Sequence, residues 1–251
     1  MSPPNHKLGN PTLLFMVSVS FFGLILAAFF AIHPPISQED FVWRKLVVGS
    51  TFGSVCMLGI LAVFFPNLCS RFVGVGKREK QNSFHGSKRS VSISHNTAPG
   101  LRGHHPLCRR FSSHVFRING GMFCATCSGL FLGALIVLAG IGAYFFKDWH
   151  VGQNAFLAVL IGVAGVFLGL LQSPLHIFQS SVIRLFSGIF FVVGTFLILV
   201  GIEELTHNTS VDLFFVALSV FWLMTRISLS QWNHQRICSK CTLTSCSFVK
   251  R

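Results

Sequence analysis

Long apolar segments alternate with short polar ones along the chain, and one extended polar interruption lies in the first half. Six apolar segments have about the 18 residues or more that an α-helix needs to cross the hydrocarbon core of a bilayer. They are 12–32, 46–65, 122–146, 155–175, 185–202 and 211–227. The first is longer than the apolar region of a secretory signal and no small-residue cleavage site follows it, so it is counted as a span. The pattern predicts an all-α, polytopic membrane helix bundle with about six transmembrane helices.

The polar interruption divides the predicted bundle into parts. Residues 1–68 are expected to form a two-helix N-terminal membrane hairpin. Residues 69–103 are rich in Ser, Gly, Lys and Arg and poor in large apolar side chains, which predicts a basic, flexible cytoplasmic linker. Residues 104–227 start with a Cys/His motif and continue as a four-helix membrane domain, and 228–251 are expected to form a cytoplasmic Cys-rich tail.

Composition and charge agree with a membrane protein and predict its orientation. Hydrophobic residues make up 51% of the chain and charged residues only 11%, which is too apolar for a soluble domain of this length. With the N-terminus inside, 17 of the 20 lysines and arginines fall in cytoplasmic segments, as the positive-inside rule requires. We therefore expect a cell-membrane protein with both termini cytoplasmic.

The formal net charge of +13 also bears on partners. Retention of basic loops in the cytoplasm explains this charge, and the basic linker lacks the interleaved aromatic residues of a nucleic-acid-binding segment. No nucleic acid is therefore expected as a partner. The lipid bilayer is the expected environment, and the basic loop is expected to attract anionic lipid headgroups.

A segment just before the third predicted span concentrates histidines and cysteines. Its candidate metal ligands are His104, His105, Cys108, His114, Cys124 and Cys127. Two cysteines separated by two residues can share one tetrahedral ion, and Cys108 with one upstream histidine would complete the coordination. Because three histidines compete for one or two positions, the ligand set stays open. Thiols stay reduced in the cytoplasm, so a disulfide framework is not expected.

The tail repeats this chemistry. Its candidate ligands, spaced H-x3-C-x2-C-x4-C, are His234, Cys238, Cys241 and Cys246. A short tail cannot build a core, and a bound metal would supply its folding energy. The tail cysteines alternatively share a site with the central group. Zinc is the simplest metal for these ligands, and an iron–sulfur cluster is the alternative because it also takes four thiolates.

Two other functions remain open at this stage. The first is a membrane thiol–disulfide oxidoreductase that uses Cys124 and Cys127, since the N-terminus of a helix stabilises thiolates. The surrounding histidines favour metal binding, because a redox pair needs none of them. The second is a transporter or channel built around residues 172–184, against which the lack of buried charges is the main objection.

Two polar groups next to predicted spans have ordinary structural interpretations. A solvated interfacial turn broken by Pro174 is expected to contain Gln172, His176, Gln179 and Arg184. If they face inward instead, His176 and Arg184 would line a pocket beside the metal site. At the opposite membrane face, a wetted acidic loop is expected to contain Glu203, Glu204, His207 and Asp212.

Pairs of small residues separated by three positions suggest close helix packing. The pairs are Gly49 with Gly53, Gly129 with Gly133, and Gly165 with Gly169. Such pairs let helix backbones approach each other closely in lipid. They are consistent with a homo-oligomer through these faces.

The run His104-His105-Pro106-x-Cys108, with His114 and then Cys124-Ala-x-Cys127-x-Gly129, resembles a family of prokaryotic multi-pass membrane proteins of unknown function, found in archaea and bacteria. In the commoner form of that family, Cys-His-Gln and Arg-Ser-Phe precede a Cys-Ala-Arg-Cys-x-Gly helix start. This chain has no Cys-His-Gln, and Thr126 replaces the arginine. The resemblance implies a membrane protein with a cytoplasmic Cys/His motif and implies no reaction.

These observations together predict a function without assigning a reaction. The chain has no Walker loop, no dinucleotide fingerprint and no paired intramembrane carboxylates. Whether it is an enzyme stays open. We expect an integral membrane protein with a cytoplasmic Cys/His metal-binding module, most simply for zinc, in a structural or regulatory role.

Overall fold

Six long helices form the body of the protein in a computed structural model, which describes residues 11–35, 43–64, 115–118, 121–147, 149–172 and 180–239. The helices are α1 (Pro11–Ile32), α2 (Arg44–Phe64), α4 (Ala125–Phe146), α5 (Ala155–Leu171), α6 (Ser181–Thr206) and α7 (Thr209–Ser239). All six are long and apolar enough to cross a membrane. The prediction of a helical, multi-pass membrane bundle is therefore confirmed. The shorter elements are β1 (Val115–Ile118), β2 (Gly121–Cys124) and the 3-10 helix η2 (Gly152–Asn154).

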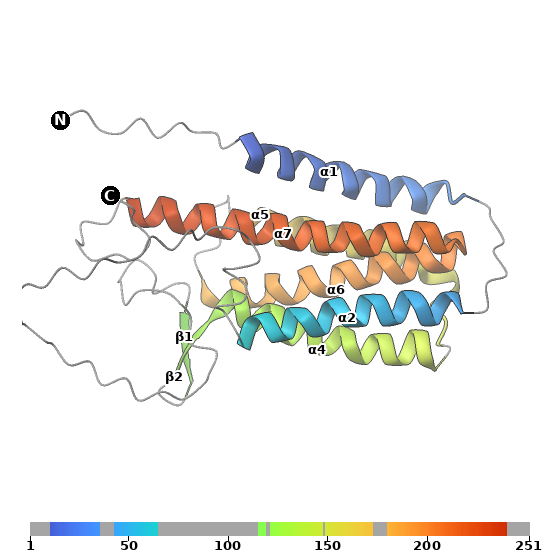
Figure 1. Cartoon of the computed structure of the whole chain (residues 1–251), viewed down its shortest axis with the longest axis horizontal. Helices are drawn as coiled ribbons and strands as arrows, with labels where there is room; N and C mark the ends of the chain where they lie inside the picture. Colours follow the sequence, from blue (N-terminus) through green and yellow to red (C-terminus); the bar gives the residue numbers. More distant parts are fainter. Residues whose placement is uncertain are drawn as a thin grey trace, which may run out of the picture.

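The helices run alongside one another, and each connection reverses the chain direction (Figure 1). The start of α1, the end of α7 and the β1–β2 hairpin all lie at the same end of the bundle. We call this the thiol end, because it carries Cys124 and Cys127. The opposite end, which carries Glu203 and Glu204, is called the carboxylate end. The side of the membrane that each end faces remains a prediction from the basic residues.

Helix α6 is the centre of the packing, and glycines bring α4 and α5 against it. A Cβ placed on Gly129 of α4 would overlap the backbone carbonyl of Leu185 in α6. A Cβ on Gly162 of α5 would lie 2.6 Å from the carbonyl oxygen of Gly194 in α6. Such close approach drives helix association in lipid, where the apolar side chains gain nothing by leaving water.

The small-residue pairs predicted from the sequence serve this internal packing. Gly133 faces Ile189 and Val192 of α6. Gly165 faces the carbonyl oxygen of Phe190, which would lie only 2.7 Å from a Cβ atom added to this glycine. Gly49 of α2 packs against Phe145 of α4. These faces are therefore occupied within one chain, and a homo-oligomer through them stays an untested prediction.

Polar contacts join α1 to α7 inside the bundle. The indole N–H of Trp222, which is fully buried, donates to the carbonyl oxygen of Ser20 at 3.0 Å. The Ser20 hydroxyl donates to the Thr225 hydroxyl at 2.9 Å. A hydrogen bond between buried side chains fixes the rotation of each helix, because an unpaired partner in an apolar interior costs about 1–3 kcal/mol. Helix α1 is thus a packed member of the bundle.

A short hairpin precedes α4, which the helical pattern did not predict. Strands β1 and β2 pair antiparallel, with Val115 opposite Cys124 and Ile118 opposite Gly121. The third predicted span began at residue 122, whereas α4 begins at Ala125. The overlooked signal is the Asn119-Gly120 pair between the strands, since Asn-Gly is the strongest two-residue hairpin sequence.

Helix α7 is longer than predicted. The sixth predicted span ended at residue 227, but α7 continues to Ser239 and includes the first half of the predicted tail. The added turns pack onto the bundle, because Leu229 and Asn233 are both buried. Arg236 also lies over the ring of Trp232, with its guanidinium carbon 5.4 Å from the ring centroid. Burial of these side chains stabilises the extension.

Candidate functional site

Cys124 and Cys127 lie together at the start of α4, as predicted. Cys124 is the last residue of β2 and the N-cap of α4, with extended backbone angles (φ −75°, ψ 120°). Cys127 lies in the first turn of the helix. Neither is in a disulfide bond, and Cys124 is only 6% exposed whereas Cys127 is partly buried. Two reduced thiols next to the positive end of a helix dipole are suited to bind a metal ion or to exchange electrons.

The hairpin brings the preceding part of the chain back to these thiols. Val115 is the register partner of Cys124. His114 precedes Val115 in the sequence and lies outside the described residues. The spacing of the motif alone did not reveal the pairing of Val115 with Cys124.

Each cysteine has an arginine beside it. The guanidinium of Arg184, in the first turn of α6, interacts electrostatically with Cys124. The guanidinium of Arg226, in α7, interacts in the same way with Cys127. Three helices therefore meet at the thiol pair. A nearby positive charge favours the anionic thiolate, which is the form that binds metals and attacks disulfides.

Arg226 is 3% exposed and is held by neutral groups. Its Nη2 donates to Oε1 of Gln172 at 3.0 Å, and its Nη1 donates to the carbonyl oxygen of Ser187 at 3.2 Å. Its guanidinium carbon lies 4.7 Å from the ring centroid of Phe191. Sequence reasoning missed Arg226, because it was counted with the basic residues at the end of the chain.

These contacts correct the prediction of a solvated turn. Gln172 is buried at 5% exposure and Arg184 is half-buried in α6, so neither belongs to a solvated loop. His176 and Gln179 lie outside the described residues. The pocket that Arg184 and His176 would line beside a metal site stays a prediction. Buried charges, whose expected lack was the main objection to a transporter, are present at both ends of the bundle.

The remaining predicted ligands lie beyond what the structure describes. Of the tail, the backbone of His234 and Cys238 belongs to α7, one helical turn apart, and their side chains are not described. Outside the described residues are His104, His105, Cys108, His114, Cys241 and Cys246. Within the described part of the chain, no three His, Cys, Asp or Glu side chains come close enough to hold a metal ion. A metal at Cys124 and Cys127 would therefore need ligands from the rest of the chain.

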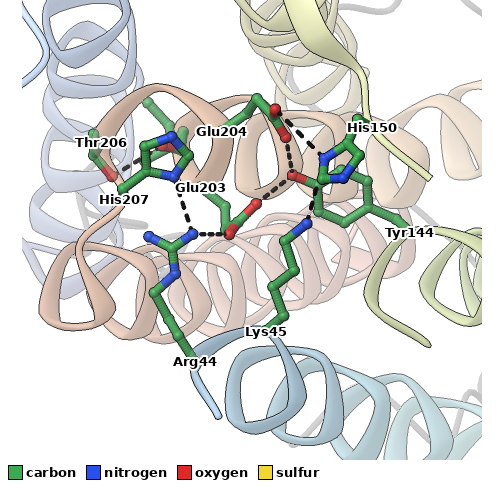
Figure 2. Close-up of polar contacts among 9 residues, drawn as sticks. Arg44, Lys45, Tyr144, His150, Glu203, Glu204, Thr206 and His207 are labelled. Atoms are coloured by element: carbon green, nitrogen blue, oxygen red, sulfur yellow. Dashed lines mark hydrogen bonds and ion pairs between the residues drawn. The ribbon is translucent and has the colours of Figure 1, made fainter. Parts of the chain in front are cut away.

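A second polar cluster is buried at the carboxylate end (Figure 2). Arg44, in the first turn of α2, forms an ion pair with Glu203 of α6, and Glu203 is fully buried. The hydroxyl of Tyr144, near the end of α4, hydrogen-bonds to Glu203 and lies 2.7 Å from Oε2 of Glu204. The cluster thus joins three helices at one point.

Two histidines and a lysine surround this core of the cluster (Figure 2). Arg44 Nη2 lies 3.0 Å from Nδ1 of His207, and since a guanidinium can only donate, Nδ1 accepts. Lys45 lies 3.5 Å from Nδ1 of His150, which is 3.7 Å from a carboxylate oxygen of Glu204. The buried carboxylate of Glu203 is therefore surrounded by cationic side chains and by a second carboxylate, that of Glu204.

The prediction of a wetted acidic loop at this end is wrong. Helix α6 continues through Glu203 and Glu204 to Thr206, and α7 begins at Thr209, so only two residues separate the helices. Asp212 is fully buried in the first turn of α7. The overlooked signal was the lack of any proline or Asn-Gly turn sequence between the apolar run and Glu203-Glu204.

Comparisons of the chain with known protein families, curated protein sequences and solved structures find no match. The resemblance to a prokaryotic membrane-protein family therefore stays a prediction that rests on the motif around Cys124. The multi-pass helical architecture is established by the six helices themselves.

Proposed function

We propose that this membrane protein binds a zinc ion at the thiol end of its bundle, in a structural or regulatory role. Cys124 and Cys127 would supply two ligands, and Cys108 with one of the histidines before β1 would supply the others. The observation that carries the proposal is the placement of both thiols at the start of α4, with Cys124 at its N-cap and Cys127 in its first turn.

The chemistry of the residues fits zinc. Zinc prefers four thiolate or imidazole ligands in a tetrahedron, and a Cys-x2-Cys pair at a helix start supplies two of them from one rigid element. Cys108 lies six residues before His114, a distance that an extended chain spans with about 20 Å of reach. The tail residues His234, Cys238, Cys241 and Cys246 would form a second site or contribute to the first.

The arginines support an anionic thiolate site. Three thiolates and one neutral histidine give a zinc complex a net negative charge, which is unfavourable at the edge of a membrane unless it is compensated. Arg184 and Arg226 interact with the two cysteines and provide that compensation. Cysteines that do not share a function would not require two cationic side chains near them.

Metal analysis of the full chain, purified without oxygen, tests this proposal. We expect about one zinc per chain for the central site, or about two if the tail binds its own ion. Cys124→Ser together with Cys127→Ser should lose the central zinc, because two of its four ligands are removed. Cys56→Ser is the matched control, since Cys56 is buried within α2 and should leave the metal content unchanged. Metal-free wild-type protein would contradict the proposal.

A thiol–disulfide oxidoreductase is the second candidate, and one observation favours it. Cys124 is the N-cap of α4 and Cys127 follows in its first turn, each next to a cation, which is an environment that activates thiolates for exchange. If the wild-type protein contains no metal, and a disulfide reagent oxidises Cys124 and Cys127 to a disulfide that a dithiol reduces again, this candidate replaces zinc binding.

A further inference from the structure

The charges of the described bundle are separated between its two ends. The three described acidic residues, Glu203, Glu204 and Asp212, all lie at the carboxylate end. Arg184 and Arg226 lie at the thiol end, where the described part of the chain has no carboxylate. Arg226 is 3% exposed, and burial of a charge without a compensating partner is costly. An anion at this end would lower that cost.

Hydrogen-bond donors at this end also lack acceptors. The Gln172 side chain is 5% exposed, and its Oε1 accepts from Arg226. Its Nε2, on the same amide group, has no hydrogen-bond partner among the described residues, and neither has the buried hydroxyl of Ser187. Both groups adjoin the Arg226 guanidinium, because the Ser187 carbonyl oxygen also accepts from it. Buried donors without acceptors indicate a ligand that accepts hydrogen bonds.

Helices α4 and α6 pack closely near their N-termini at this end. A Cβ on Gly129, the fifth residue of α4, would lie 3.1 Å from the Cα atom of Gly188, the eighth residue of α6. Neither N-cap residue, Cys124 or Ser180, caps its helix with a side-chain hydrogen bond. The N–H groups of a first helical turn and the helix dipole both favour an anion.

From these observations we propose that the thiol end binds a phosphate group between Arg184, Arg226 and Gln172. The planar guanidinium matches a phosphate oxygen pair, and Arg184, in the first turn of α6, is only half-buried. The inference rests on the proposed zinc site in one respect. A zinc ion bound by three thiolates and one neutral histidine carries one net negative charge, which compensates only one of the two arginine charges. The phosphate belongs either to an anionic lipid headgroup or to a free phosphate compound.

Native mass spectrometry of the detergent-purified full chain tests the proposal, with phosphatidylglycerol and phosphatidylcholine as probes. We expect the wild-type protein to retain phosphatidylglycerol in preference to phosphatidylcholine. Arg184→Gln should reduce that retention about tenfold, since it removes a charged hydrogen bond. Lys147→Gln removes a positive charge from an exposed side chain at the carboxylate end, outside the basic linker, and is the control, which should bind as the wild type does.

Inorganic phosphate separates the two sources of the ligand. If it displaces phosphatidylglycerol from the wild-type protein, the site takes free phosphate, and if it does not, the site takes a lipid headgroup. Equal retention of the two lipids without phosphate binding would overturn the proposal, and so would equal losses in Arg184→Gln and Lys147→Gln. If Arg184→Gln does not fold, Gln172→Leu takes its place, and unchanged retention in that variant overturns the proposal.

The proposals of a zinc site and of a phosphate site can be disproved independently of each other. The Cys124→Ser, Cys127→Ser protein lacks two of the zinc ligands at this position but keeps both arginines, so it should retain phosphatidylglycerol at least as well as the wild type. Loss of zinc with retention of the lipid identifies two sites. A wild-type protein that lacks zinc and still shows the Arg184→Gln effect leaves the phosphate site standing alone.

Discussion

At the scale of single residues, the environment of each charge decides its role. Glu203 and Glu204 are neighbours in the chain, yet Glu203 is fully buried against Arg44 and Glu204 reaches the edge of the cluster next to the exposed His150. An ion pair in an apolar interior contributes little net stability, whereas loss of one partner leaves a buried charge. Arg226 is likewise a buried charge, and its described partners are neutral groups or a thiol. Its charge is therefore not paired with a carboxylate among the described residues.

The first prediction concerns this buried pair. Glu203→Gln should lower the free energy of unfolding by about 3–5 kcal/mol, because it leaves the Arg44 charge uncompensated. Glu204→Gln is the matched control and should lower it by only about 1 kcal/mol or less, because Glu204 is partly exposed. Unfolding of the detergent-solubilised protein in denaturant measures both. Equal losses in the two variants would show that Glu203 and Arg44 do not form a buried pair.

At the scale of elements, small residues and short connections determine how the helices meet. Gly129 and Gly188 allow α4 and α6 to pack closely near their N-termini, where Arg184 interacts electrostatically with Cys124. The apolar pattern predicted the helices well, to within a few residues at most boundaries. The end of α7 and the hairpin were missed, since packing of Leu229 and an Asn-Gly turn are not visible in hydrophobicity.

The second prediction tests this contact between α4 and α6. Gly129→Ala should destabilise the protein by about 1–3 kcal/mol, because the added methyl group meets the backbone of Leu185 and the helices must separate. Gly142→Ala lies in the same helix with nothing within 4 Å of the added carbon, and should be neutral or stabilising through helix propensity. Thermal unfolding of both variants measures the difference. A Gly129→Ala protein as stable as Gly142→Ala would argue against this packing.

At the scale of the whole molecule, an even number of spans places the start of α1, the end of α7 and the thiol pair at one end (Figure 1). The distribution of lysine and arginine predicts that this end faces the cytoplasm. The two polar clusters would then lie on opposite sides of the membrane. That arrangement would keep the thiols in a reducing compartment, which preserves them as zinc ligands.

The third prediction tests this orientation. A cysteine introduced by His150→Cys should react with a membrane-impermeant maleimide added to intact cells, because the His150 side chain is 60% exposed at the carboxylate end. A cysteine introduced by Ser2→Cys at the N-terminus should react only after the cells are permeabilised. The variants are made in a background in which the native cysteines are serine, and the opposite labelling pattern would invert the topology.

The sequence by itself determined the membrane class, the number of spans and the candidate ligands, because long apolar runs and clustered cysteines are local properties of the chain. Tertiary structure alone decided which distant residues meet: Arg44 with Glu203, Arg184 with Cys124, and Arg226 with Gln172. These contacts depend on the rotation and depth of each helix against its neighbours. Close packing at glycines sets both the rotation and the depth of a helix. An apolar segment of sequence does not indicate which of its faces meets a neighbouring helix.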